Sequence, residues 1–141
     1  MAAEIIHIDG PDKTGKDSVR REIVKLGKGN YLVYVRSFLS QIAYSRLYNR
    51  NINEGFFFEC WSNAANILDN KFFFIDCDYE LVKERFIKHN EDDLDISDWK
   101  KHRDVFLEVI CEAERMGIKI NRIDTTADTI EQSAEKIEKI L

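Results

Sequence analysis

The chain has 141 residues, of which 44% are hydrophobic and 33% are charged. Chains of this length usually form one domain and this composition is typical of globular proteins, so we expect a single domain over residues 1–141. No stretch approaches the roughly 20 apolar residues that span a bilayer, and residues 1–8 are too short and too uncharged for a signal peptide. The sequence therefore argues against a membrane or secreted protein and predicts a cytoplasmic one.

The charge balance argues against a general nucleic-acid-binding protein, and the cysteines argue against a disulfide-bonded or zinc-binding one. Asp and Glu number 26 against 21 Lys and Arg, so the net charge of −5 does not indicate a general nucleic-acid-binding surface. A local site for a small anion remains open. The three cysteines, Cys60, Cys77 and Cys111, are widely spaced and form no CxxC pair. This pattern predicts reduced thiols rather than disulfides or a zinc site.

Short apolar runs alternate with amphipathic stretches along the chain. In chain order they predict a strand at 4–9, a helix at 16–26, a strand at 31–35, helices at 37–50 and 54–68, a strand at 72–75, a helix at 80–88, an acidic loop, a helix at 97–115, a strand at 118–123 and a final helix. Strands that are apolar throughout and alternate with helices are typical of a parallel sheet covered on both faces. We therefore expect an α/β fold with four or five parallel strands flanked by helices and the first strand central.

The periodicity also predicts which side chains of two helices face the core. In the first helix the inward residues are Val19, Ile23 and Leu26. In the last helix, for which Asp128 or Thr129 can serve as the cap, the predicted inward residues are Ile130, Ala134, Ile137 and Ile140.

The first strand runs directly into a glycine-containing motif. Residues 10–18, GPDKTGKDS, match GxxxxGK, the phosphate-binding loop, except that Asp17 stands where Ser or Thr is usual. Glycines let backbone N–H groups converge on phosphate oxygens, and the helix that begins at Lys16 adds its positive dipole end. The motif predicts nucleotide binding rather than an ordinary turn. The predicted binding residues are Gly10, Pro11, Lys13, Thr14, Gly15, Lys16, Asp17 and Ser18.

Three oxygen-bearing side chains are candidate ligands of Mg²⁺. The Asp17 carboxylate could hold the ion that bridges two phosphates, or it could only be a favourable acid in the first helical turn. Ser18 offers a hydroxyl one position later. Asp76 follows the third strand, where it could bind metal or cap the strand end.

Three segments of the chain resemble the thymidylate kinase family of nucleotide kinases. Residues 8–18 (IDGPDKTGKDS) are similar to that family's loop, residues 35–44 (VRSFLSQIAY) to its DRxxxSxxAY motif, and residues 73–85 (FFIDCDYELVKER) to a strand followed by a helix ending in arginine. The resemblance implies a P-loop NTPase-type fold. It also implies transfer of a phosphoryl group from ATP, with Mg²⁺, to a deoxynucleotide or a related nucleoside acceptor.

The chain departs from the family pattern at three places. No counterpart of the family's usual second strand lies between residues 26 and 31, Val35 replaces the aspartate of the DR pair, and the lid region 90–98 is acidic and lacks arginine. In family members whose lid lacks arginine, a basic residue of the loop takes over the transferred phosphoryl group. The resemblance gives that role to Lys13, for which a solvated turn residue is the alternative.

The resemblance also assigns the other site residues. It implies that Lys16 contacts the β- and γ-phosphates, that Asp12 faces the acceptor sugar, and that Arg36 grips the acceptor phosphate. It adds Ser40 and Tyr44 to the substrate-binding residues. Plainer alternatives exist, since Arg36 could cap a strand end and Tyr44 could be a core residue. Arg85, Lys88 and Arg103 belong either to the lid side of the site or to a solvated helix face.

The sequence thus predicts a nucleotide kinase whose partner is a small-molecule nucleotide. One alternative is a kinase acting on a modified base or an end within DNA, which the net charge of −5 disfavours. Another is a nucleotide-binding module without catalysis. The resemblance implies a homodimer formed through helices, and no membrane partner is expected.

Overall fold

The computed structural model describes residues 4–67, 70–89 and 96–141. In chain order, its elements are β1 (Glu4–Asp9), α1 (Lys16–Gly27), β2 (Tyr31–Val35), α2 (Phe38–Leu47), α3 (Glu54–Ile67), β3 (Asn70–Asp76), α4 (Tyr79–His89), α5 (Ile96–Arg115), β4 (Ile120–Asp124) and α6 (Ile130–Ile140). The alternation of strands and helices is as predicted, with ends that differ by a few residues. Most of the predicted acidic loop, at 90–95, lies outside the described residues. Among the helices described, none combines the length and the apolar character needed to cross a membrane.

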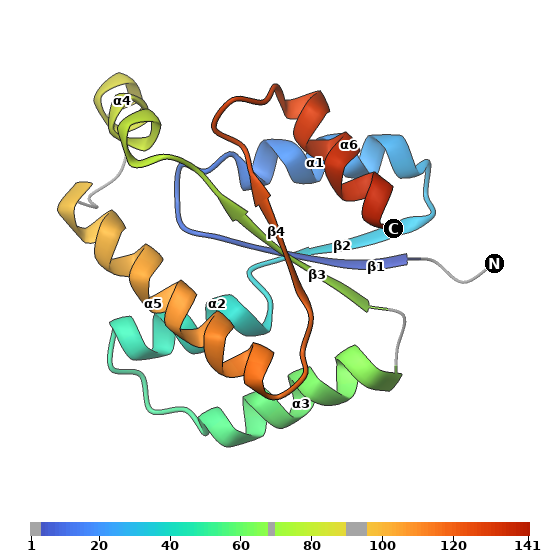
Figure 1. Ribbon diagram of the computed structural model, residues 1–141, viewed down its shortest axis with the longest axis vertical. Helices are drawn as coiled ribbons and strands as arrows, with labels where there is room; N and C mark the ends of the chain where they lie inside the picture. The colour runs from blue at the N-terminus through green and yellow to red at the C-terminus, as the bar shows by residue number, and fades with distance from the viewer. Residues whose placement is uncertain (1–3, 68–69, 90–95) are drawn as a thin grey trace.

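The strands form a four-stranded parallel sheet in the order β2-β1-β3-β4 (Figure 1). This confirms the predicted α/β fold and the interior place of β1, the strand that leads into the glycine motif. The register brings the carboxyl ends of the strands together, since Asp9 lies opposite Phe74 and Asp76 lies opposite Asp124. In open parallel sheets ligands collect at this edge.

Helices cover both faces of the sheet (Figure 1). α1 and α6 pack on one face, and α2, α3 and α5 pack on the other. Because side chains alternate along a strand, Phe73 and Ile75 of β3 join the first core while Phe72 and Phe74 join the second. The apolar runs of β1 and β3 are therefore strands buried on both faces, whereas Leu32 and Tyr34 of the edge strand β2 are 48% and 50% exposed.

The predicted inward faces of α1 and α6 are wrong at three positions. Leu26, Ile130 and Ile140 are 37%, 45% and 39% exposed. In α1 the buried row runs through Val19, Ile23 and Gly27 at intervals of four residues, which leaves Leu26 to one side. Ile130 and Ile140 lie in the terminal turns of α6, whose buried residues are Ser133, Ala134 and Ile137.

The cap of α6 is Thr129 rather than Asp128. The Thr129 side chain accepts a hydrogen bond from the Gln132 backbone, and the Gln132 side chain accepts one from the Thr129 backbone. This reciprocal capping box satisfies two backbone donors at the helix start. Asp128 instead pairs with Lys136 at 2.5 Å.

Gly10, which follows β1 directly, packs closely against the backbone of β3. A Cβ atom at this position would lie 2.3 Å from the backbone oxygen of Ile75. We predict that Gly10→Ala lowers the free energy of unfolding by about 1–3 kcal/mol, because a rigid backbone must move. Gly55→Ala in α3 is the control, since its Cβ would meet nothing closer than 3.4 Å and alanine favours helix. Denaturant titration of both variants measures the effect, and a Gly10→Ala protein as stable as the wild type would contradict it.

Candidate functional site

The site is built around the segment between β1 and α1, residues 10–15, which we call the glycine loop. Lys13 and Gly15 have left-handed backbones, with φ of 65° and 89°, so the chain curls tightly before α1 begins. Gly15 is the N-cap of α1 and has no side chain to cap it. The start of α1, with its positive dipole end, is thus open to an anion.

Three consecutive carbonyl oxygens of the glycine loop accept hydrogen bonds from distant side chains. The bonds run from Trp99 Nε1 to Asp12 (2.7 Å), from an Arg85 guanidinium nitrogen to Lys13, and from Thr125 Oγ1 to Thr14 (2.7 Å). The donors come from α5, from α4 and from the turn after β4. The loop is therefore anchored to parts of the chain that are far away in sequence.

A cavity of about 720 Å³, the loop cavity, opens beside the glycine loop and the start of α1. It is lined by Asp12, Lys13, Gly15, Lys16, Asp17, Ser18, Arg21, Arg36, Arg85 and Ile130. Five of these side chains are cationic and two are anionic, whereas the whole chain carries a net charge of −5. A concentration of positive charge in a hollow attracts and holds polyanions.

Lys16 is the most buried cation of the loop cavity, with 4% of its surface exposed. Its Nζ lies 3.4 Å from the Pro11 carbonyl oxygen and 3.5 Å from Asp12 Oδ1, so the side chain folds back over the loop. Burial lowers the pKa of Lys16, and the nearby Asp12 carboxylate opposes that shift. The arrangement keeps a lysine at the centre of the loop with its charge partly compensated.

A second, smaller cavity of about 270 Å³, the α2 cavity, lies next to the first. It is lined by Asp12, Arg36, Ser40, Gln41, Tyr44, Tyr48 and Arg50. Asp12 and Arg36 line both cavities, and an Arg36 guanidinium nitrogen lies 3.7 Å from Asp12 Oδ1. The two cavities therefore meet at this pair. The family resemblance assigned both residues to the substrate site, and the structure brings them together with Lys16, Ser40 and Tyr44.

Arg36 adopts a left-handed backbone with φ of 65°, which is uncommon for a residue other than glycine. Its backbone N–H continues the pairing of β2 with β1 by donating to the Ile8 carbonyl oxygen at 3.1 Å. The side chain is 59% exposed, so its guanidinium is accessible to a ligand. The turn thus aims a cation at the carboxyl edge of the sheet.

Asp9, at the end of β1, is a buried acid that the sequence analysis did not single out. Its Oδ1 accepts hydrogen bonds from the backbone N–H of Ser37 at 2.8 Å, from the backbone N–H of Ser40 at 3.1 Å, and from the Ser40 hydroxyl at 2.5 Å. Burial raises the pKa of Asp9 to about 6, although these hydrogen bonds and the charge of Lys16 oppose the shift. Asp9 thereby caps the start of α2 and fixes it against β1. Ser40 lines the α2 cavity, but its hydroxyl proton is held by Asp9.

Tyr44 combines the two roles that the sequence left open. Its ring stacks on Tyr48 and meets Phe106 edge-on in the core, and it also lines the α2 cavity. Burial raises the pKa of Tyr44 to about 12, and the negative charge of Asp12 adds to the shift. The phenol therefore stays protonated and can donate a hydrogen bond.

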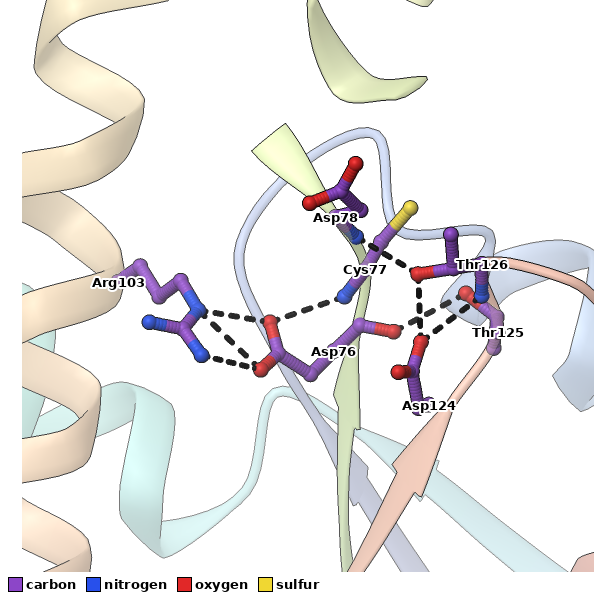
Figure 2. Close-up of polar contacts among 7 residues, drawn as sticks. All are labelled: Asp76, Cys77, Asp78, Arg103, Asp124, Thr125 and Thr126. Atoms are coloured by element: carbon purple, nitrogen blue, oxygen red, sulfur yellow. Dashed lines mark hydrogen bonds and ion pairs between the residues drawn. The ribbon is translucent and has the colours of Figure 1, made fainter. Parts of the chain in front are cut away.

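The three candidate metal ligands do not come together. Asp17 and Ser18 line the loop cavity, whereas Asp76 accepts three hydrogen bonds from Arg103, at 2.7, 2.9 and 3.1 Å (Figure 2). Asp76 lines a different cavity, of about 390 Å³, between α5 and the ends of β3 and β4. In the part of the chain that the structure describes, no three His, Cys, Asp or Glu side chains form a metal cluster. Mg²⁺ bound to phosphates often needs only one or two protein carboxylates, so Asp17 and Ser18 suit it as oxygen donors.

Several residues of the two cavities were absent from the predicted site. Arg21 lies one helical turn after Asp17, and this spacing could have placed it on the same face of α1. Gln41, Tyr48 and Arg50 line the α2 cavity without any motif that would reveal them. Of the basic residues with two alternative roles, Arg85 lines the loop cavity, Arg103 pairs with Asp76, and Lys88 is exposed.

Comparisons with known proteins find similarity in structure and not in sequence. No family model matches the chain, and no curated protein matches it. Among solved structures, the YorR protein of Bacillus subtilis, in complex with phosphorylated GDP, superposes with a TM-score of 0.80 and 16% identity over 96% of this chain and 94% of that one. Thymidylate kinase from Ehrlichia chaffeensis superposes with a TM-score of 0.57 and 12% identity over 99% of both chains. The fold is therefore similar to kinase folds, a parallel sheet flanked by helices.

The buried carboxyl group of Asp9 predicts how stability depends on pH. The native pKa of about 6 lies above the ordinary aspartate value of 3.8, so the folded protein holds a proton that the unfolded chain releases. The free energy of unfolding should therefore fall as pH rises from about 4 to about 7, with a contribution from Asp9 of up to about 3 kcal/mol. Denaturant titrations of wild type and Asp9→Asn across this range isolate the contribution. The variant should lose this part of the slope, and parallel curves for the two proteins would contradict the assignment.

Proposed function

We propose that the chain is a nucleotide kinase that transfers the γ-phosphoryl group of ATP to a nucleoside monophosphate, with a deoxynucleotide as the first candidate. The observation that carries the proposal is the meeting of two cavities at Asp12 and Arg36. One cavity combines the glycine loop with five cations, as a polyphosphate requires. The other offers arginines, tyrosines and an amide, as a small phosphorylated acceptor requires.

In this proposal the glycine loop is a P-loop, and the loop cavity beside it holds ATP. Backbone N–H groups of the glycine loop and the start of α1 bind phosphate oxygens, and Lys16 follows the β- and γ-phosphates. Asp17 and Ser18 would hold Mg²⁺, which would neutralise part of the phosphate charge. Lys13, Arg21 and Arg85 add positive charge around the triphosphate. Of the two structural neighbours, one is in complex with phosphorylated GDP and the other is a thymidylate kinase, and both support a nucleotide as ligand.

The α2 cavity holds the acceptor. Arg36 and Arg50 lie on its wall and bind the acceptor phosphate, and the Tyr44 hydroxyl and the Gln41 amide contact the sugar or base. A phosphate oxygen of the acceptor attacks the γ-phosphorus, the bond from that phosphorus to its bridging oxygen breaks, and ADP leaves with the electron pair. Such transfers need mainly positioning and charge neutralisation. Arg36, which faces both cavities, provides positioning as well as charge neutralisation.

A nucleotide-binding module without catalysis is the second candidate. One observation favours it, since Val35 precedes Arg36 where the resembling family has an aspartate. Asp12 is then the carboxylate left where the two cavities meet, and it lies within 3.7 Å of Arg36 and 3.5 Å of Lys16. The kinase proposal requires that Asp12 alone suffices there.

Phosphoryl transfer from radiolabelled ATP to a panel of acceptors tests the proposal. The panel contains the common nucleoside and deoxynucleoside monophosphates together with duplex DNA. We expect transfer to at least one free monophosphate and none to DNA. Transfer to DNA alone would identify the acceptor as part of a polymer, and ATP binding without transfer to any acceptor would support the binding module.

Lys16→Ala should lower turnover by about 10²–10³-fold, since the variant loses a charge aimed at the transferred group. Lys25→Ala is the matched control, because Lys25 lies exposed on the same helix and away from both cavities. Steady-state kinetics with the best acceptor measure both. Equal rates for Lys16→Ala and wild type would remove the glycine loop from the reaction.

Arg36→Ala should raise the KM for the acceptor more than the KM for ATP. The reason is that Arg36 lies on the wall of the small α2 cavity, whereas four other cations surround the triphosphate. Kinetics with each substrate varied in turn give the two constants. An increase confined to the KM for ATP would contradict the placement of the acceptor.

A further inference from the structure

Successive carbonyls of the glycine loop are held by side chains that lie outside the loop cavity or at its rim. Trp99, Arg85 and Thr125, which we call the tether residues, each donate to one of them. Trp99 is 1% exposed and Thr125 is 5% exposed, so these bonds form away from solvent. Trp99 packs with Cys77 and Val82 in a small core that joins α5 to α4. The tethers therefore connect the loop to well-packed parts of the fold.

The direction of these hydrogen bonds also fixes the direction in which the neighbouring N–H groups point. Every peptide bond in the described residues is trans, so each carbonyl and the N–H that follows it point in opposite directions. When the carbonyls of Asp12, Lys13 and Thr14 point toward the tether residues, the N–H groups of Lys13, Thr14 and Gly15 point away from them. Lys13 and Gly15 line the loop cavity.

We propose that the tether residues are positioning residues, which fix the polarity of the glycine loop so that its N–H groups and not its carbonyls face a bound polyphosphate. The inference rests on the proposed function, because it assigns a polyphosphate to the loop cavity. A peptide whose carbonyl has lost its tether can rotate and present oxygen to the phosphate. Anion binding must then reverse that rotation, so the affinity falls.

Adjacent threonines provide a test with a matched control. Thr125 Oγ1 donates to the Thr14 carbonyl and lies 3.1 Å from the Asp76 carbonyl, which also receives the Thr125 backbone N–H. The neighbouring Thr126 hydroxyl donates to Asp124 and accepts from the Asp78 backbone, with no bond to the loop (Figure 2). Thr125→Val and Thr126→Val each replace threonine by a side chain of the same shape that lacks the hydroxyl. Only Thr125→Val removes a hydrogen bond to a loop carbonyl.

The two tryptophans of the chain provide a second pair. Both are 1% exposed, but the Trp99 indole donates to Asp12 whereas the Trp61 indole N–H has no hydrogen-bond partner among the described residues. Trp99→Phe therefore removes a tether, and Trp61→Phe removes a buried donor that makes no bond. Arg85 is left out of the test because it also lines the loop cavity.

Calorimetric titration of the full chain with MgATP and with inorganic tripolyphosphate measures the effect. We expect Thr125→Val and Trp99→Phe each to weaken binding of both probes by about tenfold, the value of one hydrogen bond of about 1.4 kcal/mol. Thr126→Val and Trp61→Phe should bind within twofold of wild type. Thermal unfolding of the same four proteins is recorded alongside.

The outcomes separate this inference from the proposed function. Unchanged affinities in Thr125→Val and Trp99→Phe, with or without a loss of thermal stability, would show tethers that serve only the fold and would overturn the inference. If tripolyphosphate binding depends on the tether residues but the protein transfers no phosphoryl group, the proposed kinase function is contradicted and the inference about the tether residues is supported. A wild-type protein that binds neither probe would overturn both.

Discussion

Hydrogen bonds from three distant side chains to three successive carbonyls hold the glycine loop in one orientation, and the rest of the site depends on them. The donors belong to α4, α5 and the turn after β4, so the loop takes its form only when most of the chain has folded around it. The helix that follows contributes its dipole and Lys16, but neither can act on a phosphate if loop carbonyls face it. The conformation of this short motif therefore depends on contacts from distant parts of the fold.

A second constraint positions the wall of the α2 cavity. Buried Asp9 at the end of β1 accepts three hydrogen bonds from the start of α2 and so sets the wall that carries Ser40 and Tyr44. Because Asp9 immediately precedes the glycine loop, a single strand end positions both cavities. Their shared wall of Asp12 and Arg36 follows from this connection. The resulting raised pKa of Asp9 is the energetic consequence of placing a carboxyl group where water cannot reach it.

The sequence predicted the parts of this structure that local patterns encode. Continuous apolar runs identified the strands, and the spacing of Gly10, Gly15 and Lys16 identified the loop between the first strand and the first helix. The family resemblance brought Asp12, Arg36 and Tyr44 into one site, and the structure has them side by side. Each of these predictions rests on neighbours in sequence or on a motif that was already known.

Long-range contacts were out of reach for the same reason. The sequence pattern around Trp99 is that of a core residue in an amphipathic helix. Nothing in the neighbouring sequence predicts a hydrogen bond to a carbonyl 87 residues away. The exposure of Ile130 likewise depends on where α6 meets the loop cavity, which helical periodicity does not contain. The sequence left Asp76 as a metal ligand or a strand cap, and its ion pair with Arg103 of α5 depends on a contact between residues 27 positions apart, which neither pattern contains.

The central claim is that main-chain N–H groups of the glycine loop and the start of α1 surround a polyphosphate. A ¹⁵N–¹H NMR titration with MgATP follows these groups one by one. The account predicts that the largest saturable shifts occur at the amides of Lys13, Thr14, Gly15 and Lys16. Shifts that leave these four amides unmoved while others respond, or a spectrum that does not change at all, would contradict it.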